Sequence, residues 1–232
     1  MSLFDLTSIH CPACGTSSDF QAAGSVNADR RPDLRQEILD DTFQTVTCTS
    51  CGEVMRLEPV VNYLDVEFGL WLAVYPPRQI GDYQALEETV QGLFNDSYGD
   101  AASPSAQEVG AILKPRLTFG WPATREKILL ATKGLDDVAI EMLKLDLLRR
   151  LPRAPLRAGV ELRVVDVTED SLQMIWVETA SENVLESFEA NIQLLKAITD
   201  DPEPWAEIRE SLTGGVFVDI QKLYLGAGRD AA

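Results

Sequence analysis

Apolar and polar residues alternate along much of the first third of the chain, and a period of two is typical of β-strands that bury one face. The alternation predicts strands over residues 20–27, 42–47, 53–57 and 60–66, and the continuous apolar run over 68–75 predicts one more. A short helix separates the first two strands, because Pro32 suits the first turn of a helix and Leu34 and Ile38 have helical spacing. The last run is far shorter than the roughly 20 residues of a membrane helix, which indicates a buried strand.

Helical periodicity replaces this alternation after residue 80. Asp82 can cap a helix whose Leu86, Val90 and Phe94 lie on one face. The next predicted elements are helices over residues 105–113, 123–132 and 135–151, with a strand or extended link over 116–121. In the longest of these helices the apolar residues recur every three or four positions, so we expect its charged residues on the opposite face.

The last third of the chain begins with a hairpin pattern. Two alternating segments, 160–167 and 171–179, are joined by Thr168-Glu169-Asp170. Helices over 184–199 and 204–212 and a last strand over 216–225 complete the predicted elements. The order of elements predicts an α+β fold in which helices pack on a mixed, mainly antiparallel sheet.

The chain has four cysteines, in two C-x-x-C pairs that are each followed by glycine: Cys11, Cys14, Cys48 and Cys51. Such a pair brings two thiolates within bonding range of one ion, and two pairs complete a tetrahedron. We therefore predict a closed, zinc-ribbon-like metal site at the N-terminus that binds zinc, with iron as the alternative metal. A redox-active dithiol is less favoured, because such a cysteine begins a helix whereas turn formers follow Gly15.

A small, polar segment over residues 99–104 marks a candidate domain boundary. We expect a first domain over residues 1–100, which contains the metal site, and an α+β region over 104–232 that can pack on the first as one unit. Apolar strands follow the second cysteine pair without a linker. The metal-bearing ribbon is therefore expected to be an excursion from the body of the protein and not a separate module.

The net charge of −17 acts against partners that are polyanions, because such partners gain affinity from Lys and Arg. Residues 1–115 hold 6 Lys and Arg against 17 Asp and Glu, and residues 116–232 hold 14 against 20, so the metal-bearing half is the more acidic. The first residues lack the basic and apolar segments that mark a protein for secretion, so we expect reduced cysteines in the cytoplasm.

The motif Cys11-Pro12-Ala13-Cys14-Gly15, answered by Cys48 and Cys51, resembles the CpXC domain, a prokaryotic family named for two Cys-Pro-x-Cys motifs. Thr49 stands where the second proline of the family would be, which leaves both thiolates of that pair in place. Other similar positions extend over nearly the whole chain: Ser25 to Asp29, Pro32 to Leu34, Ile38-Leu39, Thr118 to Gly120, Arg125 to Lys127, Gly134 to Asp137, and Val218-Asp219. The resemblance implies a metal site and assigns no biochemical activity.

Other candidate chemistry is sparse. His10 is the one histidine, so no Ser or Cys nucleophile has an imidazole base, and we expect His10 to be a solvent-facing turn residue. The pairs Asp136-Asp137 and Glu87-Glu88 stand at predicted helix beginnings. We expect them to interact with the helix dipole on a solvated face, and not to form an acid–base pair or a magnesium site.

These observations predict a zinc-binding cytoplasmic protein that is not an enzyme. We expect it to recognise another protein, or itself in an oligomer, with zinc holding the shape of the recognising surface. A nucleic-acid-binding zinc ribbon is the first alternative, although the local basic cluster of Arg30, Arg31 and Arg35 is too small to reverse the acidic field. An enzyme with a carboxylate or dithiol site is the second. No membrane partner is expected.

Overall fold

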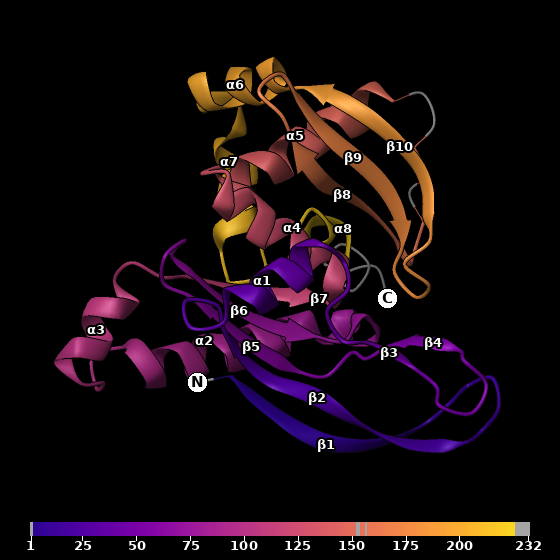
Figure 1. Ribbon diagram of the computed structural model, residues 1–232. Helices are drawn as coiled ribbons and strands as arrows, with labels where there is room; N and C mark the ends of the chain where they lie inside the picture. The colour runs from indigo at the N-terminus through magenta and orange to yellow at the C-terminus, as the bar shows by residue number, and fades with distance from the viewer. Residues whose placement is uncertain (1, 152–153, 156, 226–232) are drawn as a thin grey trace, which may run out of the picture.

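The largest sheet carries the N-terminal hairpin and has the strand order β1-β2-β5-β6-β7 (Figure 1). The computed structural model describes residues 2–151, 154–155 and 157–225. Within these residues the strands of this sheet are β1 Leu3–His10, β2 Ser17–Asn27, β5 Val61–Asp65, β6 Leu70–Tyr75 and β7 Lys114–Phe119. The β1–β2 and β5–β6 pairs are antiparallel, and the β2–β5 and β6–β7 pairs are parallel.

Helices cover both faces of this sheet. They are α1 Pro32–Leu39, α2 Tyr83–Tyr98, α3 Pro104–Gly110 and α4 Gly120–Thr132, with the 3-10 helix η1 Pro77–Asp82 before α2. On one face Tyr63 and Leu72 share a core with Ile38 of α1, and on the other Trp71 shares a core with Val90 of α2. Alternate residues of β6 thus enter opposite cores, which explains its continuous apolar sequence.

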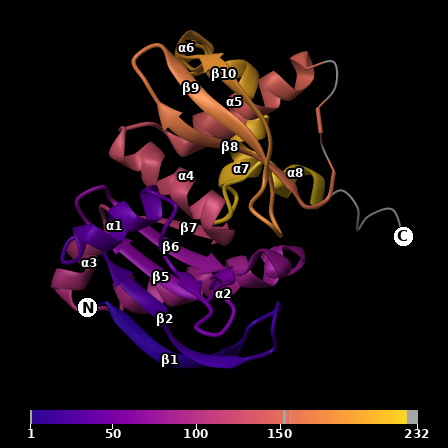
Figure 2. The same ribbon diagram turned by 45° about the vertical axis from the view of Figure 1, so that its right-hand side comes forward.

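A second sheet, with the order β10-β9-β8, lies on the far side of α4 (Figure 2). This part contains α5 Asp137–Arg150, β8 Val160–Val167, β9 Ser171–Glu178, β10 Val184–Asn191, α6 Ile192–Asp200, η2 Glu203–Trp205, α7 Ala206–Thr213 and α8 Gln221–Leu225. Met142 of α5 shares a third core with Leu162 and Trp176 of the second sheet. Among the helices of the described residues, none combines the length and apolar character needed to cross a membrane.

The α+β prediction with mainly antiparallel strands is confirmed, but the last elements differ from it. The helix expected over 184–199 begins only at Ile192, because residues 184–191 pair with β9 and Asn191 caps the helix. The strand expected over 216–225 does not form. Val216 is buried in the core beside α2, and its carbonyl accepts a single hydrogen bond from Leu117 at the end of the large sheet. The alternation analysis also missed β1.

β7 lies beyond the predicted domain boundary at residues 99–104, yet it pairs with β6 along its full length. The large sheet therefore contains strands from both predicted regions, 1–100 and 104–232. Whether these regions fold independently stays a prediction.

A network of buried ion pairs joins α4 and α5 to the second sheet. Lys144 Nζ lies 2.8 Å from Glu126 Oε2 and 3.0 Å from Glu141 Oε1, and all three side chains are fully buried. Arg163 of β8 lies 3.1 Å from Glu126 and 2.6 Å from Asp219. Of the charged residues of α5, Asp137, Glu141 and Lys144 are buried, because neighbouring elements supply their partners. Arg149 and Arg150 at the end of the helix are exposed.

We expect Lys144→Met to lower the free energy of unfolding by about 3 to 5 kcal/mol, because the variant leaves two carboxylates buried without their shared partner. Arg150→Met on the same helix is the matched control. Arg150 pairs with Asp146 on the surface, with 61% of its own side chain exposed, so its loss is expected to be below about 1 kcal/mol. Urea unfolding measures both, and equal losses would contradict the importance of the network.

Candidate metal centre

Two hairpin turns bring the four cysteines together. The first knuckle, residues 11–15, joins β1 to β2, and the second knuckle, residues 48–52, joins the two strands of a small separate sheet. These strands are β3 Thr45–Thr47 and β4 Val54–Arg56. Figure 1 shows both hairpins ending on the same side of the molecule. Residues that are far apart in the sequence thus meet at one site.

Both knuckles have the same backbone hydrogen bonds. The N–H of Gly15 donates to the carbonyl of Cys11 at 2.8 Å, and the N–H of Gly52 donates to that of Cys48 at 3.0 Å. In each knuckle the N–H of the first cysteine also donates to the carbonyl five residues later, at 2.9 and 2.8 Å. Both glycines have a left-handed backbone, with φ of 71° and 77°. This shared conformation turns the two cysteines of each pair toward one point.

The four Sγ atoms lie within 4.8 Å of one another. Cys11 and Cys51 are 3.6 Å apart, and Cys14 and Cys48 are 3.7 Å apart. Sulfurs at the corners of a tetrahedron with metal–sulfur bonds of about 2.3 Å are separated by about 3.8 Å, so the spacing fits one metal ion with four sulfur ligands. All four cysteines are free thiols. The cluster can therefore hold a metal ion.

The site is half covered by the protein. Cys11 and Cys48 are buried, whereas Cys14 and Cys51 are exposed. His10 is an exposed residue at the end of β1 and does not belong to the cluster. Around a bound metal ion, four protein sulfurs would complete a tetrahedral coordination sphere.

The thiols differ in acidity. Hydrogen bonds with Thr16 lower the pKa of Cys14 to about 6. The backbone N–H of Cys51 is the main cause that lowers the pKa of Cys48. A backbone hydrogen bond from Glu53 acts to lower the pKa of the Cys51 thiol. Hydrogen bonds between this thiol and the other three thiols, Cys14 first, outweigh that effect and raise the pKa of Cys51 to about 12. The cluster thus holds protons that a bound cation would displace.

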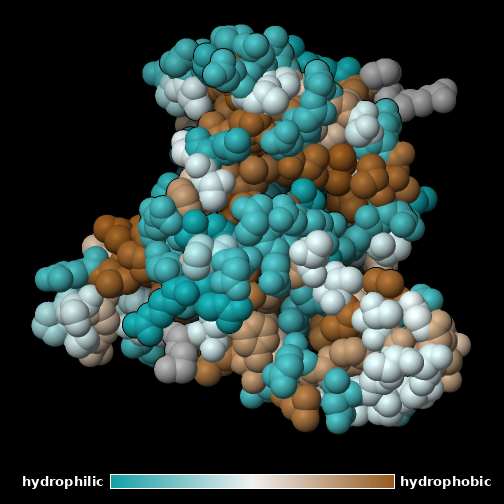
Figure 3. Space-filling view, viewed as in Figure 1, coloured by the Kyte–Doolittle hydropathy of each residue, from teal (hydrophilic) through white to brown (hydrophobic). Residues whose placement is uncertain are grey.

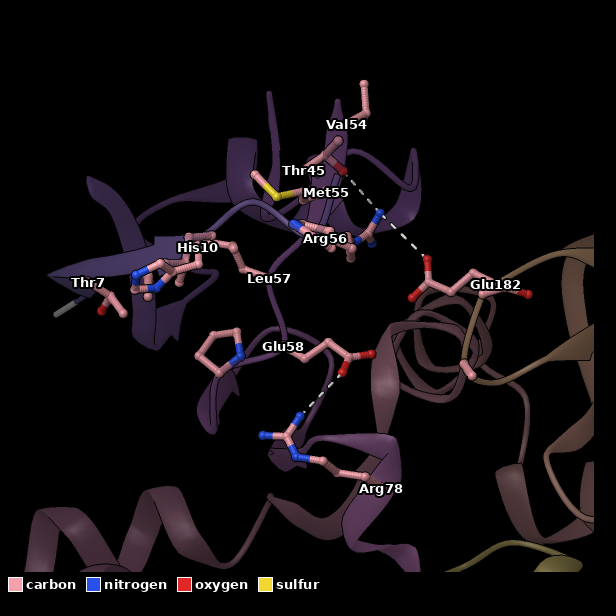
Figure 4. Close-up of a pocket in the computed structure, with 16 residues that line it drawn as sticks. Thr7, His10, Thr45, Val54, Met55, Arg56, Leu57, Glu58, Arg78 and Glu182 are labelled. Carbon is pink, nitrogen blue, oxygen red and sulfur yellow. Dashed lines mark hydrogen bonds and ion pairs between the residues drawn. The ribbon is translucent and has the colours of Figure 1, made fainter. Parts of the chain in front are cut away.

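An open groove of about 900 Å³ runs beside the knuckles (Figure 4). His10 and Pro12 form one wall, residues 54–59 form the floor, and residues 180–182, from the turn between β9 and β10, form the opposite wall. The groove therefore lies between the metal-bearing hairpins and one turn of the second sheet.

Four charged side chains in this groove are paired. Arg56 lies 3.9 Å from Glu182, and Arg78 lies 3.7 Å from Glu58. Burial raises the pKa of both glutamates, and the arginines partly offset this rise. Sequence analysis missed these residues because they come from distant segments and belong to no motif. Each of these two carboxylates therefore has an arginine partner in the groove.

The acidic pairs at the helix beginnings are not fully solvated, and that expectation was wrong for one residue of each pair. Asp137 is buried, and its carboxylate lies 2.8 Å from Arg116 and 3.0 Å from Lys127. Glu87 is largely buried and accepts the N–H of Phe217 at 2.8 Å. These carboxylates hold neighbouring elements together, which is a structural role.

The fold and the cluster define an α+β protein with a four-cysteine site built on two matching hairpin turns. The chain belongs to the CpXC family: the family model described as CpXC protein matches residues 9–144. The match includes both knuckles and ends within α5, so the second sheet and Val218-Asp219 lie outside it. A search of curated proteins and a search of solved structures each found no match.

We expect Gly52→Ala to lower the free energy of unfolding by about 1 to 2 kcal/mol, because alanine disfavours a left-handed backbone. An added Cβ would meet no atom within 4 Å, so the effect comes from the backbone alone. Gly92→Ala in α2 is the control, since its Cβ also meets no atom within 4 Å. Alanine favours the helix, so this variant should gain about 0.5 to 1 kcal/mol. Chemical denaturation measures both, and a neutral Gly52→Ala would refute the strain argument.

The metal affinity of the cluster should fall as the pH falls. The thiol of Cys14, with a pKa of about 6, gains a proton in acid, and Cys51, with a pKa of about 12, must lose its proton to bind metal. Each displaced proton lowers the apparent affinity by about tenfold per pH unit below the pKa of its thiol. Competition with a chromogenic chelator, repeated at several pH values between these two pKa values, measures how metal affinity changes with pH. An affinity that does not change with pH would show that the thiols are not the ligands.

Proposed function

We propose that Cys11, Cys14, Cys48 and Cys51 bind one zinc ion in a structural site. The near-tetrahedral spacing of four sulfur donors supports this proposal. Zinc has no redox chemistry and imposes no geometry of its own, so it suits a site that only holds two turns together. Iron is the alternative metal, since four thiolates also bind it.

We further propose that the protein is not an enzyme and works by recognising another protein, with the metal fixing the recognising surface. One observation carries this proposal. Most of β1 is exposed, yet residues 2–28 contain only two charged residues, Asp5 and Asp19. The whole chain has 20 Lys and Arg and 37 Asp and Glu. A depletion of charge is typical of the centre of a protein–protein interface.

Nucleic-acid binding is the alternative function, and the charges oppose it. Residues 1–115 have 6 Lys and Arg against 17 Asp and Glu. In the basic cluster near α1, Arg31 pairs with Asp33 at 2.6 Å, and Arg35 pairs with Asp65 and Glu67 at 2.8 and 2.9 Å. These pairs reduce the positive charge that a phosphate backbone would need.

The cytoplasm is the compartment that we propose. Cys14 and Cys51 are exposed, and free thiols of this kind persist where the surroundings are reducing.

Elemental analysis tests the metal. Protein purified under reducing conditions should carry about one equivalent of zinc, and Cys48→Ser should retain less than about half an equivalent. Thr49→Ser is the matched control, because it keeps four thiols and the hydroxyl that lies 3.4 Å from that of Ser18. A stoichiometry near two, or full loading of Cys48→Ser, would contradict the single site.

Affinity capture from native lysate tests the role. A reproducible protein partner should bind the wild type and Thr49→Ser but not Cys48→Ser. Salt-sensitive binding to DNA or RNA by the wild type would overturn the proposal in favour of nucleic-acid recognition.

A further inference from the structure

β1 forms an open edge of the large sheet. Among the described strands it pairs with β2 alone. Leu6 is 66% exposed and Leu3 is 55% exposed. Natural sheets protect long edges with lysine, proline or a bulge. β1 contains neither lysine nor proline, and the irregularity in its pairing with β2 is confined to its first two residues. The edge is therefore open to another strand along most of its length.

The peptide groups of alternate residues point out of this edge. The side chain of Gln44 accepts the N–H of Ala23 at 3.0 Å and donates to the carbonyl of Gln21 at 3.2 Å, so these groups of β2 face away from β1. Phe4 lies opposite Ala23, and Leu6 lies opposite Gln21. Because backbone bonding alternates along an antiparallel pair, the N–H and carbonyl of Leu6 face the open edge.

The surface around this edge is poor in charge. Where Figure 1 places the tips of the β1–β2 and β3–β4 hairpins, Figure 3 is mainly white, tan and brown, whereas teal covers much of the rest of this face. Residues 2–28 contain neither lysine nor arginine. A long open edge with exposed leucines and few charges has the properties of a surface that is buried when a partner binds.

We propose that a second copy of this chain covers it, with the two β1 strands paired antiparallel about a two-fold axis at Leu6. The proposal rests on the proposed function of protein recognition and names the partner. In this register Leu6 lies opposite Leu6 of the second copy, Leu3 lies opposite Ile9, and Asp5 lies opposite Thr7. Each exposed leucine of β1 gains an apolar partner, and the two Leu6 residues exchange backbone hydrogen bonds.

Neighbouring registers are less favourable. A two-fold axis preserves the faces of the sheet, so the next symmetric registers are centred on Asp5 or on Thr7. The first places two carboxylates opposite each other, and the second places Asp5 opposite Ile9 and Leu6 opposite Ser8. Of these three symmetric registers, the one centred on Leu6 is therefore the most complementary.

Charge affects this association in a distinctive way. Each copy has a formal net charge of −17, so two copies repel at long range, and added salt should strengthen the pairing by screening. Binding to nucleic acid has the opposite salt dependence. Pairing of single strands buries little surface, so we expect a reversible dimer in the micromolar range and not a permanent one.

Sedimentation velocity of the full-length, metal-loaded protein over a range of concentrations tests the inference with three lysine variants. Leu6→Lys places two like charges at the centre of the interface and should weaken dimerisation more than tenfold. Thr7→Lys places each new lysine opposite Asp5 of the second copy, and these two cross-strand ion pairs should strengthen dimerisation by about threefold to tenfold. Leu93→Lys, at a 44% exposed leucine of α2, is the control and should have no effect.

A monomeric wild type at all concentrations, or equal effects of Leu6→Lys and Leu93→Lys, would overturn the β1 dimer. A dimer that Thr7→Lys weakens as much as Leu6→Lys does would overturn the register centred on Leu6. Thermal unfolding of each variant confirms that the fold is retained. Metal content and partner capture by Cys48→Ser are measured separately, so failure of the dimer and failure of the metal-dependent recognition give different results.

Discussion

The close approach of four sulfur atoms constrains the whole N-terminal part of the structure. The sulfurs lie within 4.8 Å of one another, and thiolates at this spacing repel unless protons or a cation lie among them. The small sheet that carries the second knuckle has two strands of three residues each, and a hairpin of this size is at best marginally stable alone. In the proposed site the metal therefore fixes the small sheet against the first hairpin, a role that a hydrophobic core has elsewhere. The charge-poor edge strand β1 ends directly at the first knuckle, so the proposed metal site adjoins the proposed recognition surface.

Buried charge, in contrast, connects the part of the chain that the family model matches to the part beyond it. The carboxylate of Glu126 contacts Lys144 at 2.8 Å, and it also accepts the N–H of Val164 and contacts Arg163 in the second sheet. Burial alone would raise the pKa of Asp219, but Arg163 and the nearby lysines lower it to about 2, so this carboxylate is ionised at neutral pH. Replacing a buried ion pair with apolar residues is often harmless, whereas removing one partner is not. The network therefore makes the position of the second sheet depend on several residues at once.

The sequence predicted those features that local patterns determine. Two C-x-x-C-G motifs identified the four cysteines that the structure brings together, and the hairpin at β8 and β9 followed from alternation and a polar turn. Features that depend on tertiary contacts were not predictable. Residues 184–191 are a strand because β9 offers them an edge, although their composition also suits a helix. Glu141 and Lys144 look like ordinary surface residues of a helix until α4 and β8 bury them. The ion pairs of the groove combine residues as distant as Arg56 and Glu182, and no spacing rule joins them.

The central claim is that the four cysteines hold one metal ion between the two knuckles. X-ray absorption spectroscopy at the metal edge tests it most directly, because the spectrum reports the ligand atoms and their distances. We expect a single shell of four sulfurs at about 2.3 Å from zinc in the purified protein. A shell that contains nitrogen or oxygen ligands, or a protein that has no bound metal while all four thiols are reduced, would contradict the claim.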